Sequence, residues 1–241
     1  MAVVFCGALM ALALAVALPA HSATVQLTSS ADYSGSPSVN AAGSVVAFES
    51  EADLAGGNAD KSREVFVINS DGTGLQQLTT DAALSSCHPV ISADGSVMVF
   101  QSMADLTGGN SDNSFEIFAI NSDGTGLKQL TNTTWPSNCG HPATDGDGSL
   151  VAFASDGDLT GGNSDNSREV FSINSDGTGL RQLTSETNPA YASWANSVSA
   201  DGSAVVLESE ADLAGGNSDH SWEVFWINSD GTGLRQLTSD A

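Results

Sequence analysis

The feature that most constrains this chain is an eight-residue sequence, Ile-Asn-Ser-Asp-Gly-Thr-Gly-Leu, that occurs four times. It occupies residues 68–75, 120–127, 173–180 and 227–234, at intervals of 52, 53 and 54 residues. A repeat at a nearly fixed period is typical of a chain that copies one supersecondary unit in series. Each unit then buries its apolar face against its neighbours. We therefore expect one array of similar units.

Each repeat contains four segments that have the character of β-strands. In the first repeat, "GSVVAFES" at residues 43–50 and "EVFVIN" at 64–69 are short, rich in Val, Ile and Phe, and bounded by Gly, Asn, Asp and Ser. Such runs predict strands, and their lack of polar alternation predicts that both faces are buried. "PSVNA" at 37–41 and "GLQQLT" at 74–79 supply the first and last strands. The Asp-Gly pair between the third and fourth strands predicts a tight hairpin.

Small four-stranded sheets with both faces buried must stack on one another in series. Stacking around an axis gives an all-β fold, the β-propeller, built from four-stranded antiparallel blades. The last strand has an extra copy at residues 24–28, so we expect an incomplete or open propeller whose first or last blade exposes Val, Leu and Phe. The four expected blades occupy about residues 36–79, 88–131, 141–184 and 195–238.

The repeats resemble the TolB-type propeller repeat, a relative of the WD repeat found in bacterial envelope and secreted proteins. The shared elements are a Pro-to-Gly start ("PSVNAAG"), the "VAF.S" strand, "E-[VI]-F-x-I-N-S-D-G-T-G" and the closing "L-[QKR]-Q-L-T". The resemblance covers residues 24–241 and implies a module that binds a protein or ligand on a propeller face. Two departures stand out. Asn196 replaces the proline that begins the other repeats, and the loop between the second and third strands is longer than in the family.

The net charge argues against one class of partner. The chain has 29 acidic and six basic residues, for a formal charge of −23. Nucleic-acid binding needs a basic face, which six scattered Lys and Arg residues cannot supply. The acidity would instead attract cations or basic partners.

Residues 1–23 predict a secretory signal peptide. An apolar run from Ala2 to Leu18 is followed by small residues suited to signal peptidase. We expect cleavage between about Ala20 and Thr24, a periplasmic or secreted mature chain, and no stable membrane insertion after cleavage. The alternative is an uncleaved anchor, because the apolar run approaches the roughly 20 residues that span a bilayer.

The mature chain keeps two cysteines, Cys87 and Cys139, each just before a His-Pro pair. In an oxidising compartment they form either a disulfide or two free thiols, and both alternatives remain open. The neighbouring His88 and His141 add a third alternative, a zinc or copper site, although the spacing matches no known metal motif. The His-Pro pairs have a simpler interpretation as caps at the start of a strand.

The residues favour a non-catalytic binding or scaffold module. Serine hydrolysis needs a nucleophile, a base and an orienting acid, yet no Gly-x-Ser-x-Gly sequence occurs, and the predicted mature chain has only His88, His141 and His220. We therefore expect no enzyme and no cofactor, with calcium as the exception. Two alternatives remain. One is the propeller part of a hydrolase or lyase whose catalytic region is absent here; the other is a calcium-stabilised surface protein.

The calcium hypothesis rests on the inserted loops. Directly before each third strand stands Asn-x-Asp-x-Ser-x-Glu, itself preceded by Asp-Leu-x-Gly-Gly. Oxygen-bearing side chains at every second position are how an EF-hand begins its calcium cage, although the bidentate acid at the EF-hand's spacing is missing. The alternative is a solvated acidic loop held by Asx turns. The predicted ligands are Asn58, Asp60, Asn110, Asp112, Asn163, Asp165, Asn217 and Asp219.

Overall fold

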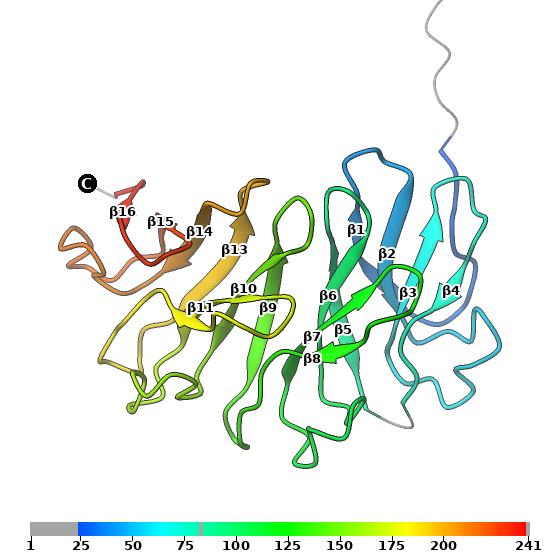
Figure 1. The fold of residues 1–241 in the computed structure, drawn as a ribbon, viewed down its shortest axis with the longest axis horizontal. Coiled ribbons are helices and arrows are strands. Elements are labelled where there is room, and N and C mark those ends of the chain that lie inside the picture. The colour runs from blue at the N-terminus through cyan, green and yellow to red at the C-terminus, as the bar shows by residue number, and fades with distance from the viewer. Residues whose placement is uncertain (1–23, 82–83, 240–241) are drawn as a thin grey trace, which may run out of the picture.

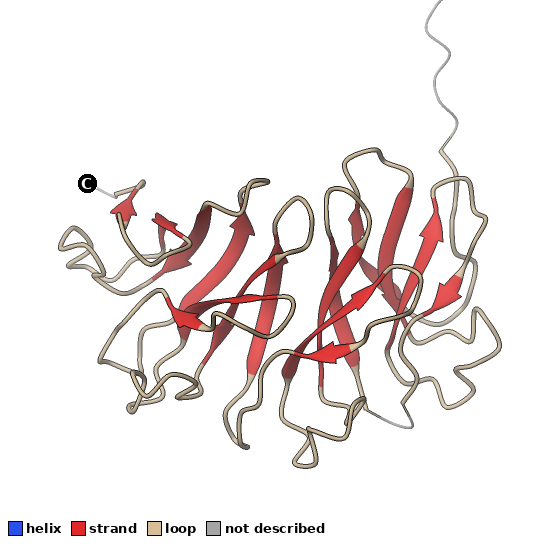
Figure 2. Ribbon diagram, viewed as in Figure 1, coloured by secondary structure: helices blue, strands red, loops and turns tan. Residues whose placement is uncertain are grey.

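The computed structural model describes residues 24–81 and 84–239, and in this part of the chain every regular element is a β-strand (Figure 2). The predicted signal peptide lies outside the described residues. Four antiparallel sheets form, each with its four strands in chain order. The first two are β1 (Ser34–Val39), β2 (Val45–Ser50), β3 (Glu64–Asn69), β4 (Gln76–Gln77), and β5 (Ser86–Ile91), β6 (Val97–Ser102), β7 (Glu116–Asn121), β8 (Lys128–Gln129). The last two are β9 (Cys139–Thr144), β10 (Leu150–Ser155), β11 (Glu169–Asn174), β12 (Arg181–Gln182), and β13 (Ser193–Val198), β14 (Ala204–Ser209), β15 (Glu223–Asn228), β16 (Arg235–Gln236).

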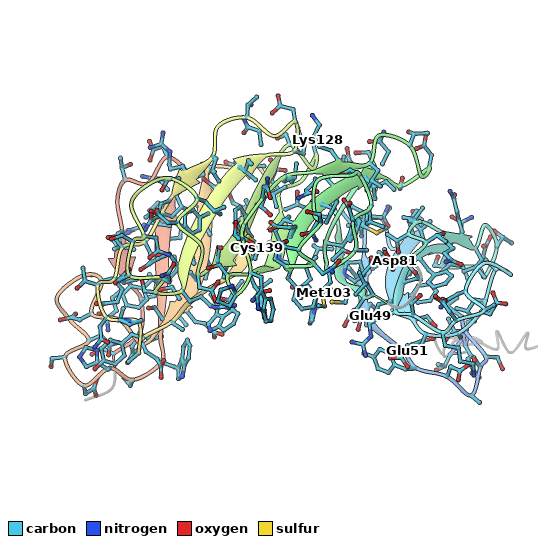
Figure 3. All side chains as sticks on the ribbon, turned by 90° about the horizontal axis from the view of Figure 1, so that it is seen from below. Glu49, Glu51, Asp81, Met103, Lys128 and Cys139 are labelled. Carbon is cyan, nitrogen blue, oxygen red and sulfur yellow. The ribbon has the colours of Figure 1, made fainter. Side chains whose placement is uncertain are left out.

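The four sheets, here called blades 1 to 4, follow one another face to face along an open arc (Figure 1). Their first strands are neighbours in space, with β1 against β5, β5 against β9 and β9 against β13. These strands line the hollow side of the arc, whereas Lys128 of β8 lies on its outer side (Figure 3). The predicted all-β architecture of four antiparallel four-stranded blades in an open arrangement is confirmed. Among the described residues, no helix is long and apolar enough to cross a membrane.

The repeated octapeptide folds as a self-contained turn. Asp71 Oδ1 accepts hydrogen bonds from the backbone N–H and the hydroxyl of Thr73, at 2.9 and 2.6 Å. These bonds, led by the hydroxyl, lower the pKa of Asp71. Gly72 and Gly74 both have positive φ, 84° and 68°, which glycine adopts without steric cost. The same bonds recur in the other three blades, so the octapeptide encodes the hairpin between the third and fourth strands.

The core lies between the blades. Between blades 1 and 2, Phe100 and Phe118 stack with ring centroids 5.6 Å apart and pack against Val65 and Val67. Equivalent clusters fill the next two interfaces. Strands β3, β7 and β11 are buried on both faces, as their unbroken apolar runs predict. The same prediction is wrong for β15, whose residues alternate between buried and half-buried because no further blade of the described chain covers its outer face. Each fully buried Phe contributes about 2 kcal/mol of transfer free energy, so the stacking of blades stabilises the array.

The two end faces of the array differ. On blade 1, Leu27 packs against the cluster that contains the buried Phe66. Leu78, which follows the last strand of blade 1, packs in the same way against the cluster that contains Phe118 of blade 2. Residues 24–28 cover this face without pairing as a strand, although their sequence matches a last strand. On blade 4, Leu237 is 55% exposed, whereas the equivalent Leu183 is 7% exposed. The exposed Leu expected on an end blade is therefore found on blade 4. The expected exposure of Phe is wrong, because Phe225 of blade 4 packs against blade 3 and Phe66 of blade 1 is covered by Leu27.

Candidate functional site

The hollow side of the arc contains a groove that crosses all four blades. A volume of about 380 Å³ is lined by Ser36, Ser38, His88, His141 and Asn196 among other residues of the four first strands. A second hollow, of about 260 Å³, is lined by later residues of the same strands. Together these two hollows are called the inner groove. Because β1, β5, β9 and β13 all contribute, the groove exists only in the assembled array.

A bulge in the first strand places each histidine of the His-Pro pairs in the groove. His88 and His141 both have φ of 53°, and strand pairing shifts register next to each of them. Blade 4 lacks the proline, and there the register shift lies between Ala195 and Ser197. The imidazoles of His88 and His141 stack at 5.6 Å, and the indole of Trp194 meets His141 edge-on at 4.4 Å. Rings from three blades thus form a continuous row.

The backbone of each of these histidines is held by the preceding blade. Glu49 Oε2 accepts a hydrogen bond from the His88 backbone N–H at 2.7 Å. Gln101 Oε1 accepts the corresponding bond from the His141 N–H at 3.0 Å. The His-Pro pairs therefore join consecutive blades. They lie at a bulge inside β5 and β9, so the expectation that they cap the start of a strand is wrong.

Glu49 is a buried carboxylate that the sequence did not single out. Tyr33 donates its hydroxyl to Glu49 Oε1 at 3.2 Å, and Arg63 Nη1 lies 3.5 Å from the same oxygen. Arg63 also pairs with Glu51 at 3.0 Å and stands 4.8 Å above the Tyr33 ring. The one available signal is position: the residue after the phenylalanine of the second strand is Glu49 in the first repeat and Gln101 in the second.

Both cysteines are free and buried. Cys139 donates its thiol to Ser155 Oγ at 3.3 Å, and burial raises its pKa. Burial, followed by the nearby Glu49 carboxylate, raises the pKa of Cys87 to about 11. Ligand atoms of Glu49, Cys87 and His88 lie within 4.8 Å of one another, the only such group of three or more acidic, Cys or His residues in the described chain. The cysteines thus differ in their surroundings, and only Cys87 has potential metal ligands beside it.

The predicted calcium ligands occur as one Asn-Asp pair in the loop of each blade. In blade 1, Asn58 is buried; its Nδ2 donates to the Ser62 carbonyl at 2.8 Å, and its N–H donates to Asp53 at 3.0 Å. These bonds are the Asx-type contacts of the alternative interpretation. The same bonds hold Asn110, Asn163 and Asn217.

Oxygen atoms crowd around the serine of each loop. Ser62 Oγ lies 3.0 Å from Asn58 Oδ1, 3.2 Å from Asp60 Oδ1, 2.9 Å from Glu64 Oε1 and 2.8 Å from the Asp81 carbonyl. A hydroxyl has one hydrogen and can donate to only one of these acceptors. Four oxygens also surround the serine of blade 3, and three surround those of blades 2 and 4.

The glutamate that closes each loop pattern is part of the blade's interior. Glu64 accepts hydrogen bonds from the Asp81 N–H at 2.7 Å and from the Thr79 hydroxyl. Burial raises the pKa of Glu64 and of its equivalent Glu169. Each glutamate thus joins the start of the third strand to the segment that leaves the fourth strand. The sequence pattern locates this residue, and only the structure shows that it is buried.

Solved structures of similar shape identify the fold. The β-propeller domain of the Trilobed protease from Pyrococcus furiosus, which has an open velcro topology, superposes with a TM-score of 0.53 at 12% identity. The match covers 86% of this chain and 58% of that one. The chain is a β-propeller.

Two further structures share this propeller architecture. TolB from Acinetobacter baumannii gives a TM-score of 0.56 at 18% identity, over 88% of this chain and 45% of TolB. The oligogalacturonate lyase of Vibrio parahaemolyticus gives 0.54 at 15%, over 84% of this chain and 53% of the lyase. No family model and no curated protein matches the sequence. The propeller spans only about half of these proteins, and identities this low establish the fold alone.

Proposed function

We propose that this propeller is a binding module of the bacterial envelope or extracellular space and holds a protein partner in the inner groove. The observation that carries the proposal is the row of rings formed by His88, His141 and Trp194 across three blades. Ring-bearing side chains on rigid strands are well suited to recognition, because little conformational entropy is lost when they are covered. Arg168 lies 4.4 Å above the Trp194 ring and extends the row.

The shape and charge of the groove favour an extended, basic segment of a partner protein. The two hollows follow the same four strands, which suits a ligand longer than a small molecule. A chain of net charge −23 attracts basic segments and repels acidic ones. The binding function also agrees with the TolB-type repeat that the sequence resembles.

Site-specific crosslinking tests this function. A photoreactive residue at Val39, which is exposed in the groove, is compared with one at Lys128 on the outer side of the arc (Figure 3). In the exporting bacterium we expect an adduct of defined mass from Val39 that weakens when Trp194 becomes Ala. The same adducts from Lys128, or none from Val39, would contradict the groove as the binding surface.

Export is part of the proposed function. The predicted signal peptide at residues 1–23 would deliver the chain to the periplasm or beyond. Amino-terminal sequencing of the protein from a secreting host should give a first residue between about Ala20 and Thr24. A chain that keeps Met1 in the membrane fraction would favour the anchor instead.

The oxygen-rich loops support a second candidate, in which calcium stabilises the propeller. Calcium takes six to eight oxygen ligands, and each loop gathers three or four oxygens around a serine that can donate to only one of them. In blade 3, Asp165 Oδ2 is buried without a hydrogen-bond partner. A cation would satisfy these oxygens together. The hydrolase or lyase alternative is kept open by the lyase and protease propellers of similar shape.

A further inference from the structure

We propose that Glu49, Cys87 and His88 form a zinc site at the junction of blades 1 and 2, with a fourth coordination position open to the inner groove. This inference is independent of the proposed binding function, because it concerns the ligands of a metal and not the partner in the groove.

The donor set fits zinc. Potential ligand atoms of the three side chains, one carboxylate oxygen, one thiol sulfur and one imidazole nitrogen, lie within 4.8 Å of one another. Zinc binds these three atom types in tetrahedral geometry, at about 2.0 to 2.3 Å, so modest side-chain rotations would bring all three onto one ion. Three protein ligands leave one position for water or another ligand. His88 lines the groove, and this position therefore opens towards it.

The surrounding contacts orient the ligands. Tyr33 and Arg63 hold Glu49 Oε1, and the His88 backbone N–H holds Oε2. A carboxylate oxygen has two lone pairs, so Oε2 keeps one for a metal. Outer contacts of this kind fix the direction of a ligand and strengthen metal binding. Because β2 and β5 are packed strands, the ligands are held on rigid elements.

The next junction supplies an internal control. Between blades 2 and 3 the corresponding residues are Gln101, Gly140 and His141, with the same bond from the side chain to the histidine N–H. Here the carboxylate is an amide and the thiol is missing, so only one good zinc ligand remains. The backbone arrangement is therefore shared, whereas the donor set occurs at the first junction alone.

Binding has a defined proton balance. The Cys87 thiol loses its proton to solvent as sulfur bonds to the metal, and neither oxidant nor reductant takes part. Cobalt(II) in place of zinc makes the bond visible, since a cobalt–thiolate bond gives a charge-transfer absorption in the near ultraviolet. We expect the reduced, full chain to develop this band on addition of cobalt and to lose it when zinc displaces the cobalt.

Substitutions at the two histidines and at Cys87 test which residues bind the metal. His88→Asn keeps a residue that tolerates positive φ at an exposed position, so the fold should survive while cobalt affinity falls about tenfold or more. His141→Asn is the matched control and should keep the wild-type affinity. Cys87→Ser should abolish the charge-transfer band. No band in the wild-type chain, a band that persists in Cys87→Ser, or equal affinity in the two His→Asn variants would each overturn the proposal.

Discussion

The first two junctions between blades share one backbone design and differ in chemistry. At each, a side chain from the second strand of one blade accepts the N–H of a positive-φ histidine in the next blade, Glu49 for His88 and Gln101 for His141. At the first junction the acceptor is a buried carboxylate beside Cys87; at the second it is an amide beside Gly140.

Comparing equivalent positions in the four blades of this chain separates residues that serve the fold from residues that serve a site. A feature that recurs from blade to blade, such as the hairpin octapeptide or Glu64 and its equivalents, serves the fold that every blade must adopt. A residue that departs from its equivalents is not required by that fold. Cys87 differs from its equivalent in every other blade, and Glu49 differs from Gln101 and Ala154 but is matched by Glu208 in blade 4. Glu49 and Cys87 lie together only at the first junction, which is why we assign them a site.

The largest expected effect comes from a recurring residue. Glu169→Ala removes a fully buried carboxylate and leaves the Thr184 hydroxyl and the Glu186 N–H without their acceptor. We expect a loss of about 3 kcal/mol in the free energy of unfolding, because buried donors lose a charged partner. Urea unfolding followed by fluorescence measures it. The cobalt band should be unchanged, and a loss below about 1 kcal/mol would contradict the structural role.

Calcium should act on the recurring loops and leave the junction alone. Binding only to the folded state stabilises it by RT ln(1 + [Ca²⁺]/Kd), about 1 kcal/mol for each occupied loop when calcium exceeds Kd several-fold. Thermal unfolding at constant ionic strength, with magnesium as the control, measures the shift. Asn163→Ala should reduce it. A melting temperature that millimolar calcium and magnesium change equally would exclude calcium sites.

A smaller effect is expected at the junctions. Gln101→Ala leaves the His141 N–H without its acceptor and should cost about 1 kcal/mol of unfolding free energy. Glu49→Gln keeps an acceptor for His88, so its cost should be smaller, yet it should weaken cobalt binding. If Gln101→Ala weakened cobalt binding and Glu49→Gln did not, the roles assigned to the two junctions would be reversed.

The smallest effect concerns the pH dependence of stability. Burial, followed by the neighbouring His88, lowers the pKa of His141. The folded state therefore disfavours the imidazolium. The stability contribution is present above the unfolded pKa of about 6.5 and is lost as pH falls from that value through the lower folded pKa. Urea midpoints at about pH 7 and pH 5 should show a smaller decrease for His141→Asn than for the wild type. An identical decrease in both would contradict this assignment.

The repeat made much of the fold predictable. Four blades, two-sided burial of the third strand in the first three blades, and the Asp-Gly hairpins follow from short-range patterns in the repeats. The prolines of the His-Pro pairs marked the first strands. These patterns do not predict the contacts between blades, because those contacts depend on which residues face each other across a packed interface.

The candidate site shows this limit most clearly. The sequence indicated Cys87 and His88 as possible metal ligands. Their partner Glu49 is 39 residues from His88 in sequence and belongs to another blade, so the sequence did not indicate it. The positive φ of His88 and the row of rings also depend on packing between blades. For the calcium loops, the sequence located the residues and could not show that Asn58 is buried.

The most direct test counts cobalt–thiolate sites after the two junctions are exchanged. Glu49→Gln with Cys87→Gly gives the first junction the chemistry of the second, and Gln101→Glu with Gly140→Cys does the reverse. A Cβ at Gly140 would meet only the end of the flexible Gln101 side chain, at 2.8 Å, so the position accepts cysteine with a small shift. We expect about one site per chain in the wild type, none in the first variant and about two in the second. Equal numbers in all three proteins, or no site in the wild type, would contradict the assignment of the metal to the first junction.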